Sequence, residues 1–148
     1  MQTFPDSTGR TWALTINTAA VKRVRTQLDV NLLAIIEDGF KLFSDLTTDF
    51  VLLVDVLYVL CKAEADQRNV SDEDFGRSMA GDCLGKAADA LIEELVDFFP
   101  DARKRTMLKT VIAKSHKVSD KALAAADKML AALNEEQLVM NAIDSASS

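Results

Sequence analysis

Few residues of this 148-residue chain have the types and spacing that catalysis or metal binding requires. A nucleophilic thiol needs a neighbouring base, and His116 is the only histidine that could serve Cys61 or Cys83. The two cysteines stand in apolar stretches, 22 positions apart, without the spacing of a zinc or redox motif. We therefore expect two buried thiols, and we expect His116 in a basic, solvated helix end.

A phosphate-binding loop is the second chemical possibility, because glycines cluster from Gly76 to Gly85. The Walker pattern needs four residues between two glycines, followed by Lys and then Ser or Thr. Gly76 and Gly81 have this spacing but precede Asp82-Cys83, whereas Gly81 and Gly85 precede a lysine but lie one residue too close. We interpret these glycines as a junction where small residues let helices approach each other.

Asp55 is the most unusual single residue, since it stands in the middle of the apolar run 50–61. A charge in such a run needs a partner or a shifted pKa. One interpretation is a catalytic acid. The alternatives that we favour are an ion pair with an Arg or Lys of another helix, or a solvated stripe on its own helix.

The acidic clusters Asp72-Glu73-Asp74 and Glu93-Glu94 lack the neighbouring ligands of a calcium loop, so we expect solvated faces there. The chain therefore predicts no catalytic, cofactor-binding or metal site, and no enzyme.

Composition predicts a folded domain, with 49% hydrophobic and 27% charged residues. The 17 Lys and Arg are outnumbered by 23 Asp and Glu, and the net charge of −6 argues against nucleic acid as the main partner. The start of the chain lacks the pattern of a signal peptide, and the apolar run 50–61 is too short to cross a membrane. We expect a cytoplasmic protein with no membrane partner.

The first 16 residues predict a β-hairpin. Trp12, Leu14 and Ile16 alternate with smaller or polar residues, which is the period of a strand with one buried face. The turn cluster Asp6-Ser7-Thr8-Gly9 precedes them, and Gln2-Thr3-Phe4 supplies the other strand. An isolated hairpin is marginal in water, so this face should pack on helices or on another chain.

From Asn17, a good N-cap, the spacing of apolar residues becomes helical. Thr47 or Thr48 is expected to cap a central helix over 49–67 that the other helices surround. Ser71 begins a short helix that ends near Gly81. The helix after it carries a single apolar stripe and stops before Pro100. The members of that stripe are Leu84, Ala88, Leu91, Ile92, Leu95 and Phe99.

Two more helices are expected after Pro100. One lies around 107–112, and the last begins at Val118-Ser119-Asp120, with a break at Asn134. The fold class is therefore mainly α, with an N-terminal β-hairpin over 1–16 and a bundle of about five to six helices over 17–143. Residues 1–143 form a single domain in this prediction, and 144–148 form a disordered tail.

Charge is segregated along the helical part. Residues 62–99 hold four Lys and Arg against ten Asp and Glu, a net charge of −6, whereas residues 101–121 hold seven against two, a net charge of +5. Such a distribution suits head-to-tail self-association into a homo-oligomer, or docking of a charged helical partner. Pairing of acidic and basic helices within one monomer is the third interpretation, and all three stay open.

The layout of the chain resembles the tail assembly chaperones of long-tailed phages and prophages. The resemblance covers residues 4–99, whereas 118–143 has no counterpart. It starts with the hairpin Asp6-Ser7-Thr8-Gly9-Arg10-Thr11-Trp12-Ala13-Leu14-Thr15-Ile16 and the helix over 17–28. Leu46-Thr47-Thr48-Asp49 leading into Phe50-Val51-Leu52-Leu53, and the later Ala90-Leu91-Ile92-Glu93-Glu94-Leu95, continue it.

The resemblance implies a non-enzymatic protein of the bacterial host cytoplasm. It would bind the long, helical tape-measure protein, with the tail tube protein as a further partner, and help tube subunits assemble. The alternatives from other classes are a structural virion or neck component, and a small helical regulator that binds a host protein.

Overall fold

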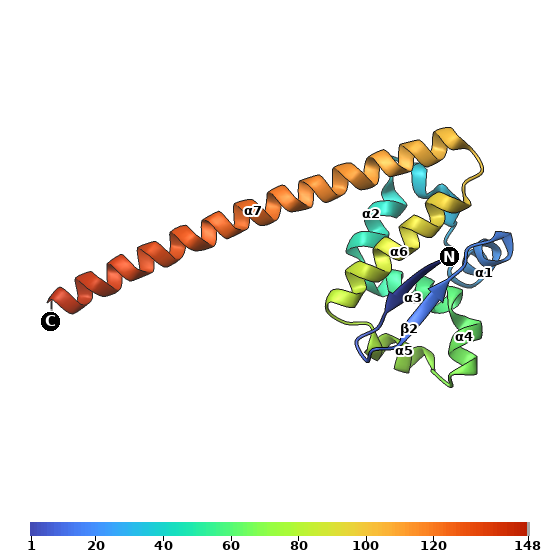
Figure 1. Cartoon of the computed structure of the whole chain (residues 1–148), viewed down its shortest axis with the longest axis horizontal. Helices are drawn as coiled ribbons and strands as arrows, with labels where there is room; N and C mark the ends of the chain where they lie inside the picture. The colour runs from blue at the N-terminus through green and yellow to red at the C-terminus, as the bar shows by residue number, and fades with distance from the viewer. Residues whose placement is uncertain (148) are drawn as a thin grey trace. The chain divides into compact units, whose positions relative to one another are not determined.

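The computed structural model describes the backbone of residues 1–147 and the side chains of residues 1–117 and 121–134. Over this part of the chain the fold is mainly helical with an N-terminal β-hairpin, as predicted, and seven α-helices and one short 3-10 helix follow the strands (Figure 1). The elements are β1 (Gln2–Pro5), β2 (Thr11–Leu14), α1 (Thr18–Leu28), η1 (Leu32–Ile36), α2 (Lys41–Thr48), α3 (Phe50–Leu60), α4 (Lys62–Gln67), α5 (Asp72–Ser78), α6 (Asp82–Phe98) and α7 (Ala102–Ser147).

Internal contacts group the chain into two units, Met1–Leu108 and Lys109–Ser148. The first unit holds the hairpin, the helices from α1 to α6 and the beginning of α7. The second unit consists of the rest of α7. The single domain over 1–143 stays a prediction.

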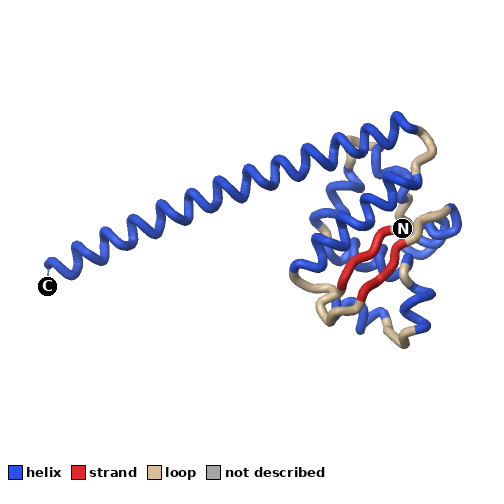
Figure 2. Tube along the Cα trace, in the orientation of Figure 1, coloured by secondary structure: helices blue, strands red, loops and turns tan. Residues whose placement is uncertain are grey.

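The hairpin forms as the alternation predicts (Figure 2). β1 and β2 pair antiparallel, with Phe4 opposite Trp12. Phe4, Trp12 and Leu14 are almost completely buried, and both strands contact α6. Gly9 in the turn has a φ of 92°, a conformation that side chains other than glycine rarely adopt. The hairpin is therefore stabilised by packing on a helix, as its short length requires.

α3 is the central helix of the first unit. It contacts α1, α2, α4, α5 and α6, and Leu53, Val56 and Leu57 are fully buried. Burying such a side chain contributes roughly 1.5–3 kcal/mol, so a helix that is apolar on nearly every side organises the core around itself. The expected continuous helix over 49–67 divides at Cys61 into α3 and α4.

The predicted cap of the central helix was wrong by one or two residues. Asp49 caps α3, because its side chain accepts the backbone N–H of Leu52 at 3.2 Å. Thr47 and Thr48 instead end α2, and their hydroxyls donate to carbonyl oxygens one turn earlier. Threonine hydroxyls can satisfy such carbonyls within a helix, which removes them from the capping role. Asn17 and Ser71 cap α1 and α5 as predicted.

The two helices expected after Pro100 are one helix. α7 continues through Val118-Ser119-Asp120 and through Asn134, so neither the predicted start nor the predicted break is present. No glycine or proline interrupts 102–147, and the segment is rich in alanine, leucine and lysine, which favour a helix. α7 also covers 144–147, where a disordered tail was expected, and Ser148 lies outside the described residues.

Candidate functional site

A surface groove of about 310 Å³ lies in the first unit where α3, α5 and the beginning of α6 meet. We call it the α3–α5 groove. Its lining residues are Phe50, Val51, Val54 and Asp55 of α3, Asp72 and Gly76 of α5, Met79 of the link after α5, and Leu84 of α6. Most of these side chains are apolar, and the two that carry charge are both carboxylates. The groove therefore combines an apolar surface with negative charge.

The apolar character of α3 explains why this surface is apolar. One side of the helix fills the core, and Phe50 and Val51 at its beginning lie on the other side. Phe50 is 49% exposed and Val51 is 74% exposed. Scattered exposed apolar side chains are ordinary, but two neighbours beside a groove are typical of a surface that binds another molecule.

Gly76 lines the groove on the side of α5. This glycine lies inside a helix and has no positive φ, so the backbone does not require glycine there. A Cβ atom added at Gly76 would meet no atom within 4 Å. Glycine inside a helix costs roughly 0.5–1 kcal/mol relative to alanine. The chain therefore carries a destabilising residue at an exposed position that lines the groove.

Asp55 is half-buried in the wall of the groove, and no ion pair with Arg or Lys is found for it among the described residues. Of the two alternatives that we favoured, the ion pair is therefore wrong, and the partly solvated position of Asp55 on α3 agrees with the solvated stripe. Burial, with the carboxylates of Asp72 and Asp49 adding to it, raises the pKa of Asp55 above its ordinary value. The ionised carboxylate is thus less well stabilised here than in water.

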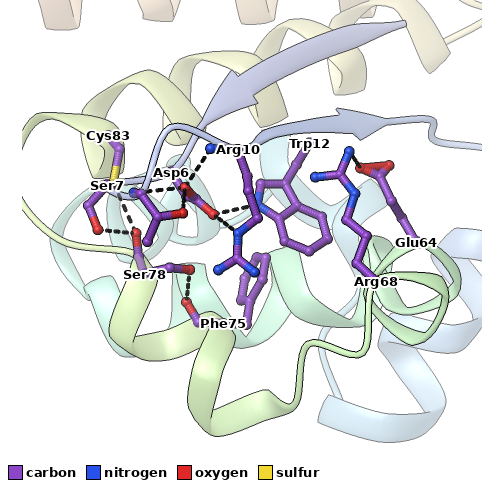
Figure 3. Close-up of polar contacts among 10 residues, drawn as sticks. Asp6, Ser7, Arg10, Trp12, Glu64, Arg68, Phe75, Ser78 and Cys83 are labelled. Carbon is purple, nitrogen blue, oxygen red and sulfur yellow. Dashed lines mark hydrogen bonds and ion pairs between the residues drawn. The ribbon is translucent and has the colours of Figure 1, made fainter.

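The turn of the hairpin is organised by the buried carboxylate of Asp6 (Figure 3). Its Oδ1 accepts the backbone N–H and the hydroxyl of Thr8 and the backbone N–H of Arg10, at 2.7–3.0 Å. Its Oδ2 accepts Arg10 Nε at 2.9 Å and Trp12 Nε1 at 3.0 Å. Five donors thus fix one side chain, and Asp6 holds the turn and the buried indole together.

The pKa of Asp6 follows from the same contacts. Burial raises it, but the hydrogen bonds from Thr8, Trp12 and Arg10 together outweigh burial and hold the pKa well below its usual range. Asp6 is therefore ionised at every physiological pH, which is the state that its donors require. A group held so firmly in one protonation state is a structural anion and is poorly suited to acid–base catalysis.

The indole of Trp12 packs between aromatic and cationic groups. Phe75 of α5 meets it edge-on, with ring centroids 5.1 Å apart. The guanidinium of Arg68 lies 4.9 Å from the ring centroid and that of Arg10 lies 5.7 Å from it. Both arginines also pair with carboxylates, Arg68 with Glu64 and Arg10 with Asp6. The cluster is thus charge-compensated and links β2, α4 and α5 (Figure 3).

The other chemical candidates are not brought together. Cys61 and Cys83 are buried and free, as predicted, and burial raises the pKa of Cys61 to about 12. His116 is exposed inside α7, in the second unit, and not at the helix end that we expected. Within the described residues no three His, Cys, Asp or Glu side chains gather as a metal site would require.

The glycine cluster is not the close helix junction that we expected, because a Cβ atom added at Gly76, Gly81 or Gly85 would meet no atom within 4 Å. Gly76 and Gly85 lie inside helices, and Gly81 precedes α6 with a φ of 68°. Glu73 is exposed and pairs with Arg77. Glu94 was expected to be solvated, but it is buried and pairs with the N-terminal ammonium of Met1 at 2.9 Å. Glu94 is buried because it lies among the buried residues of α6, the helix that packs against the hairpin.

Two features were missed by reasoning from the sequence. Asp6 was assigned only to a turn cluster, although Asp two residues before Thr and six before Trp places its carboxylate within reach of both. The α3–α5 groove brings residues 50–55 together with residues 72–84, which are distant from them in sequence, and only Gly76 hinted at it. The signal that could have indicated the groove is a glycine inside a helix at a position where no turn requires it.

A scan against family models finds none that matches this chain, and searches of curated proteins and of solved structures find no match either. Among the described helices, none combines the length and the apolar character that crossing a bilayer demands.

Proposed function

We propose that this chain is a non-enzymatic assembly chaperone of the phage-tail type, which binds its helical client, the tape-measure protein, in the α3–α5 groove. The observation that carries the proposal is the exposed pair Phe50 and Val51 beside the space at Gly76. An apolar groove between helices is the geometry in which an amphipathic helix docks, through anchors spaced three or four residues apart.

The chemistry-bearing residues favour binding over catalysis. Asp6 is committed to five hydrogen bonds, both thiols are buried, and the groove that Asp55 faces is lined by no hydroxyl, thiol or imidazole group. General acid–base catalysis needs a partner within hydrogen-bond reach of the reacting group, and the described contacts of Asp55 provide none. We place the protein in the bacterial cytoplasm, where tail assembly takes place.

The size of the groove suits weak, reversible binding. A volume of about 310 Å³ accommodates only a few side chains. Burying two apolar anchors contributes roughly 3–6 kcal/mol, and the entropy lost on association offsets much of this. A chaperone that must release its client to the growing tube needs affinity of this limited kind.

Co-expression of this chain with the tape-measure protein tests the proposal, with the groove closed in one variant. Gly76→Leu places a side chain into the groove, and Gly85→Leu is its matched control, because Gly85 is an exposed helical glycine that does not line the groove. We expect the wild type and Gly85→Leu to keep the client soluble and Gly76→Leu to lose this ability, with both variants melting no lower than the wild type.

Two results would contradict the proposal. In the first, the client is equally soluble without this chain or with Gly76→Leu. In the second, the chain is found at fixed stoichiometry in mature particles, which would make it a structural virion component.

A further inference from the structure

The α3–α5 groove holds two carboxylates and no cation. Asp55 comes from the middle of α3 and Asp72 from the first turn of α5, and neither forms an ion pair within the part of the chain that the structure describes. Several other carboxylates of this unit do pair with a cation of their own helix. The pairs are Lys62 with Asp66, Arg68 with Glu64, and Arg77 with Glu73 and Asp74.

The absence of compensation has an energetic cost. Asp55 loses part of its hydration in the groove wall, and Asp72 and Asp49 repel its negative charge. A ligand that brings a positive charge would remove both costs at once. A purely apolar ligand would make them worse, because it would bury the carboxylate further without a partner.

We infer that the groove selects client helices that carry a lysine or arginine beside their apolar anchors, and that Asp55 is the residue that recognises this cation. The inference rests on the proposed function, since it takes the occupant to be a client helix. Val51 and Asp55 are four residues apart on α3, so an apolar contact and a charge lie one helical turn apart on one face. A docking helix with an anchor and a cation at the same spacing matches both.

The lining favours such a side chain over a free metal ion. Calcium takes six to eight oxygen ligands, whereas the groove offers two carboxylates among apolar side chains. Lysine and arginine have apolar stems that pack along Phe50 and Val54 while their charged ends reach the carboxylates. The composition of the groove thus corresponds to a long cationic side chain next to an apolar one.

The test uses three fluorescent, alanine-rich helical peptides that differ at one position. Each has two leucines one turn apart and, one turn further, lysine, glutamine or glutamate. By fluorescence anisotropy we expect the lysine peptide to bind the full chain about five- to tenfold more tightly than the glutamine peptide, and the glutamate peptide most weakly. The preference should shrink as salt increases, because salt screens partly exposed pairs.

Two variants assign the preference. Asp55→Asn should bind the lysine and glutamine peptides equally, within about twofold, whereas the matched control Asp29→Asn, at an exposed position outside the groove, should keep the preference. Gly76→Leu should weaken binding of all three peptides.

The outcomes separate the inference from the proposed function. If the peptides bind the wild type, and Gly76→Leu weakens them, but lysine has no advantage or keeps it in Asp55→Asn, the inference fails while the groove remains a docking site. If no peptide binds, or if Gly76→Leu changes nothing, the docking role of the groove fails and the inference fails with it.

Discussion

Ser7 donates two hydrogen bonds to the carbonyl oxygen of Ser78, one from its backbone N–H and one from its hydroxyl, both 2.8 Å long. These bonds connect the hairpin turn to the last turn of α5. α5 has only seven residues, too few for a helix to be stable by itself in water. Its position therefore depends on contacts such as this one and on the packing of Phe75 against Trp12. The side of the groove that Asp72 and Gly76 form is thus held in place from the N-terminal hairpin.

Asp6→Asn should destabilise the first unit by about 2–4 kcal/mol. The asparagine oxygen can still accept the donors at Oδ1, but its amide group would face two N–H donors, from Arg10 and Trp12, in place of Oδ2. Urea unfolding at pH 7 measures this change. Asp29→Asn is the control, because Asp29 is exposed with a φ of 56°, a conformation that asparagine tolerates well.

The difference in stability between the wild type and Asp6→Asn should depend on pH, with a sign that follows from the pKa of Asp6. The pKa of Asp6 is lower in the folded state than in the unfolded state, so its contribution is complete above the unfolded pKa, near 3.8, and is lost as pH falls below it. The difference in unfolding free energy between the wild type and Asp6→Asn should therefore be constant from pH 7 to about pH 5 and shrink towards pH 3. A difference that grows on acidification would contradict this account of the turn.

Trp12→Ala should destabilise the protein by about 3–5 kcal/mol, because a fully buried indole is replaced by a cavity. Trp12→Phe keeps an aromatic ring against Phe75 but loses the N–H donor to Asp6, and about 1–2 kcal/mol should be lost. Thermal unfolding followed by far-UV circular dichroism measures both, since Trp12 is the only tryptophan and its fluorescence is lost in both variants. Unchanged melting of Trp12→Ala would show that the hairpin does not support the fold.

Three glycine-to-alanine substitutions should change the free energy of unfolding in different directions, depending on the backbone conformation of each glycine. Gly76→Ala and Gly85→Ala lie in helices with open space around the new Cβ, so each should raise the free energy of unfolding by about 0.5–1 kcal/mol. Gly81→Ala should lower it by about 1–3 kcal/mol, because the φ of 68° and ψ of −140° before α6 suit glycine alone. Chemical denaturation measures the free energy of unfolding of the three variants. Equal effects at all three positions would contradict the prediction that the backbone conformation of each glycine decides the sign.

Asp55→Asn should stabilise the free protein at neutral pH, although it removes a charged side chain. The pKa of Asp55 is raised on folding, so folding favours the protonated acid and the ionised form weakens the fold. The advantage of asparagine should be present at pH 7 and fade as pH falls through the folded pKa of Asp55 towards its unfolded value. Melting temperatures of the two proteins across this range check the sign, and a less stable Asp55→Asn at pH 7 would mean that the carboxylate has a stabilising partner.

The features that could be predicted from the sequence are those that local signals determine. The alternation at Trp12 and Leu14 predicts the hairpin. Asn17 and Ser71 are preferred N-cap residues, and each begins a helix as predicted. α7 shows the limit of such signals. Val118-Ser119-Asp120 has the composition of a helix start, but without a glycine or proline nearby the helix continues through it.

The α3–α5 groove could not be predicted in the same way. Its lining residues come from positions 50–84, and nothing local places Asp72 near Asp55. Tertiary packing decides which side of an apolar helix such as α3 is covered. Asp6 is the intermediate case, since its turn was expected but its five donors depend on the folded hairpin.

The empty space at Gly76 also has a consequence for selection. Alanine there would improve the stability of α5, so variants selected from a random library for heat resistance alone should accumulate alanine or larger helix-forming residues at position 76. Variants selected for keeping a client soluble should retain glycine. The two libraries would diverge at this position and agree at Gly81, where the backbone itself demands glycine. Selection for stability alone would therefore replace Gly76, whereas selection for client binding would keep it.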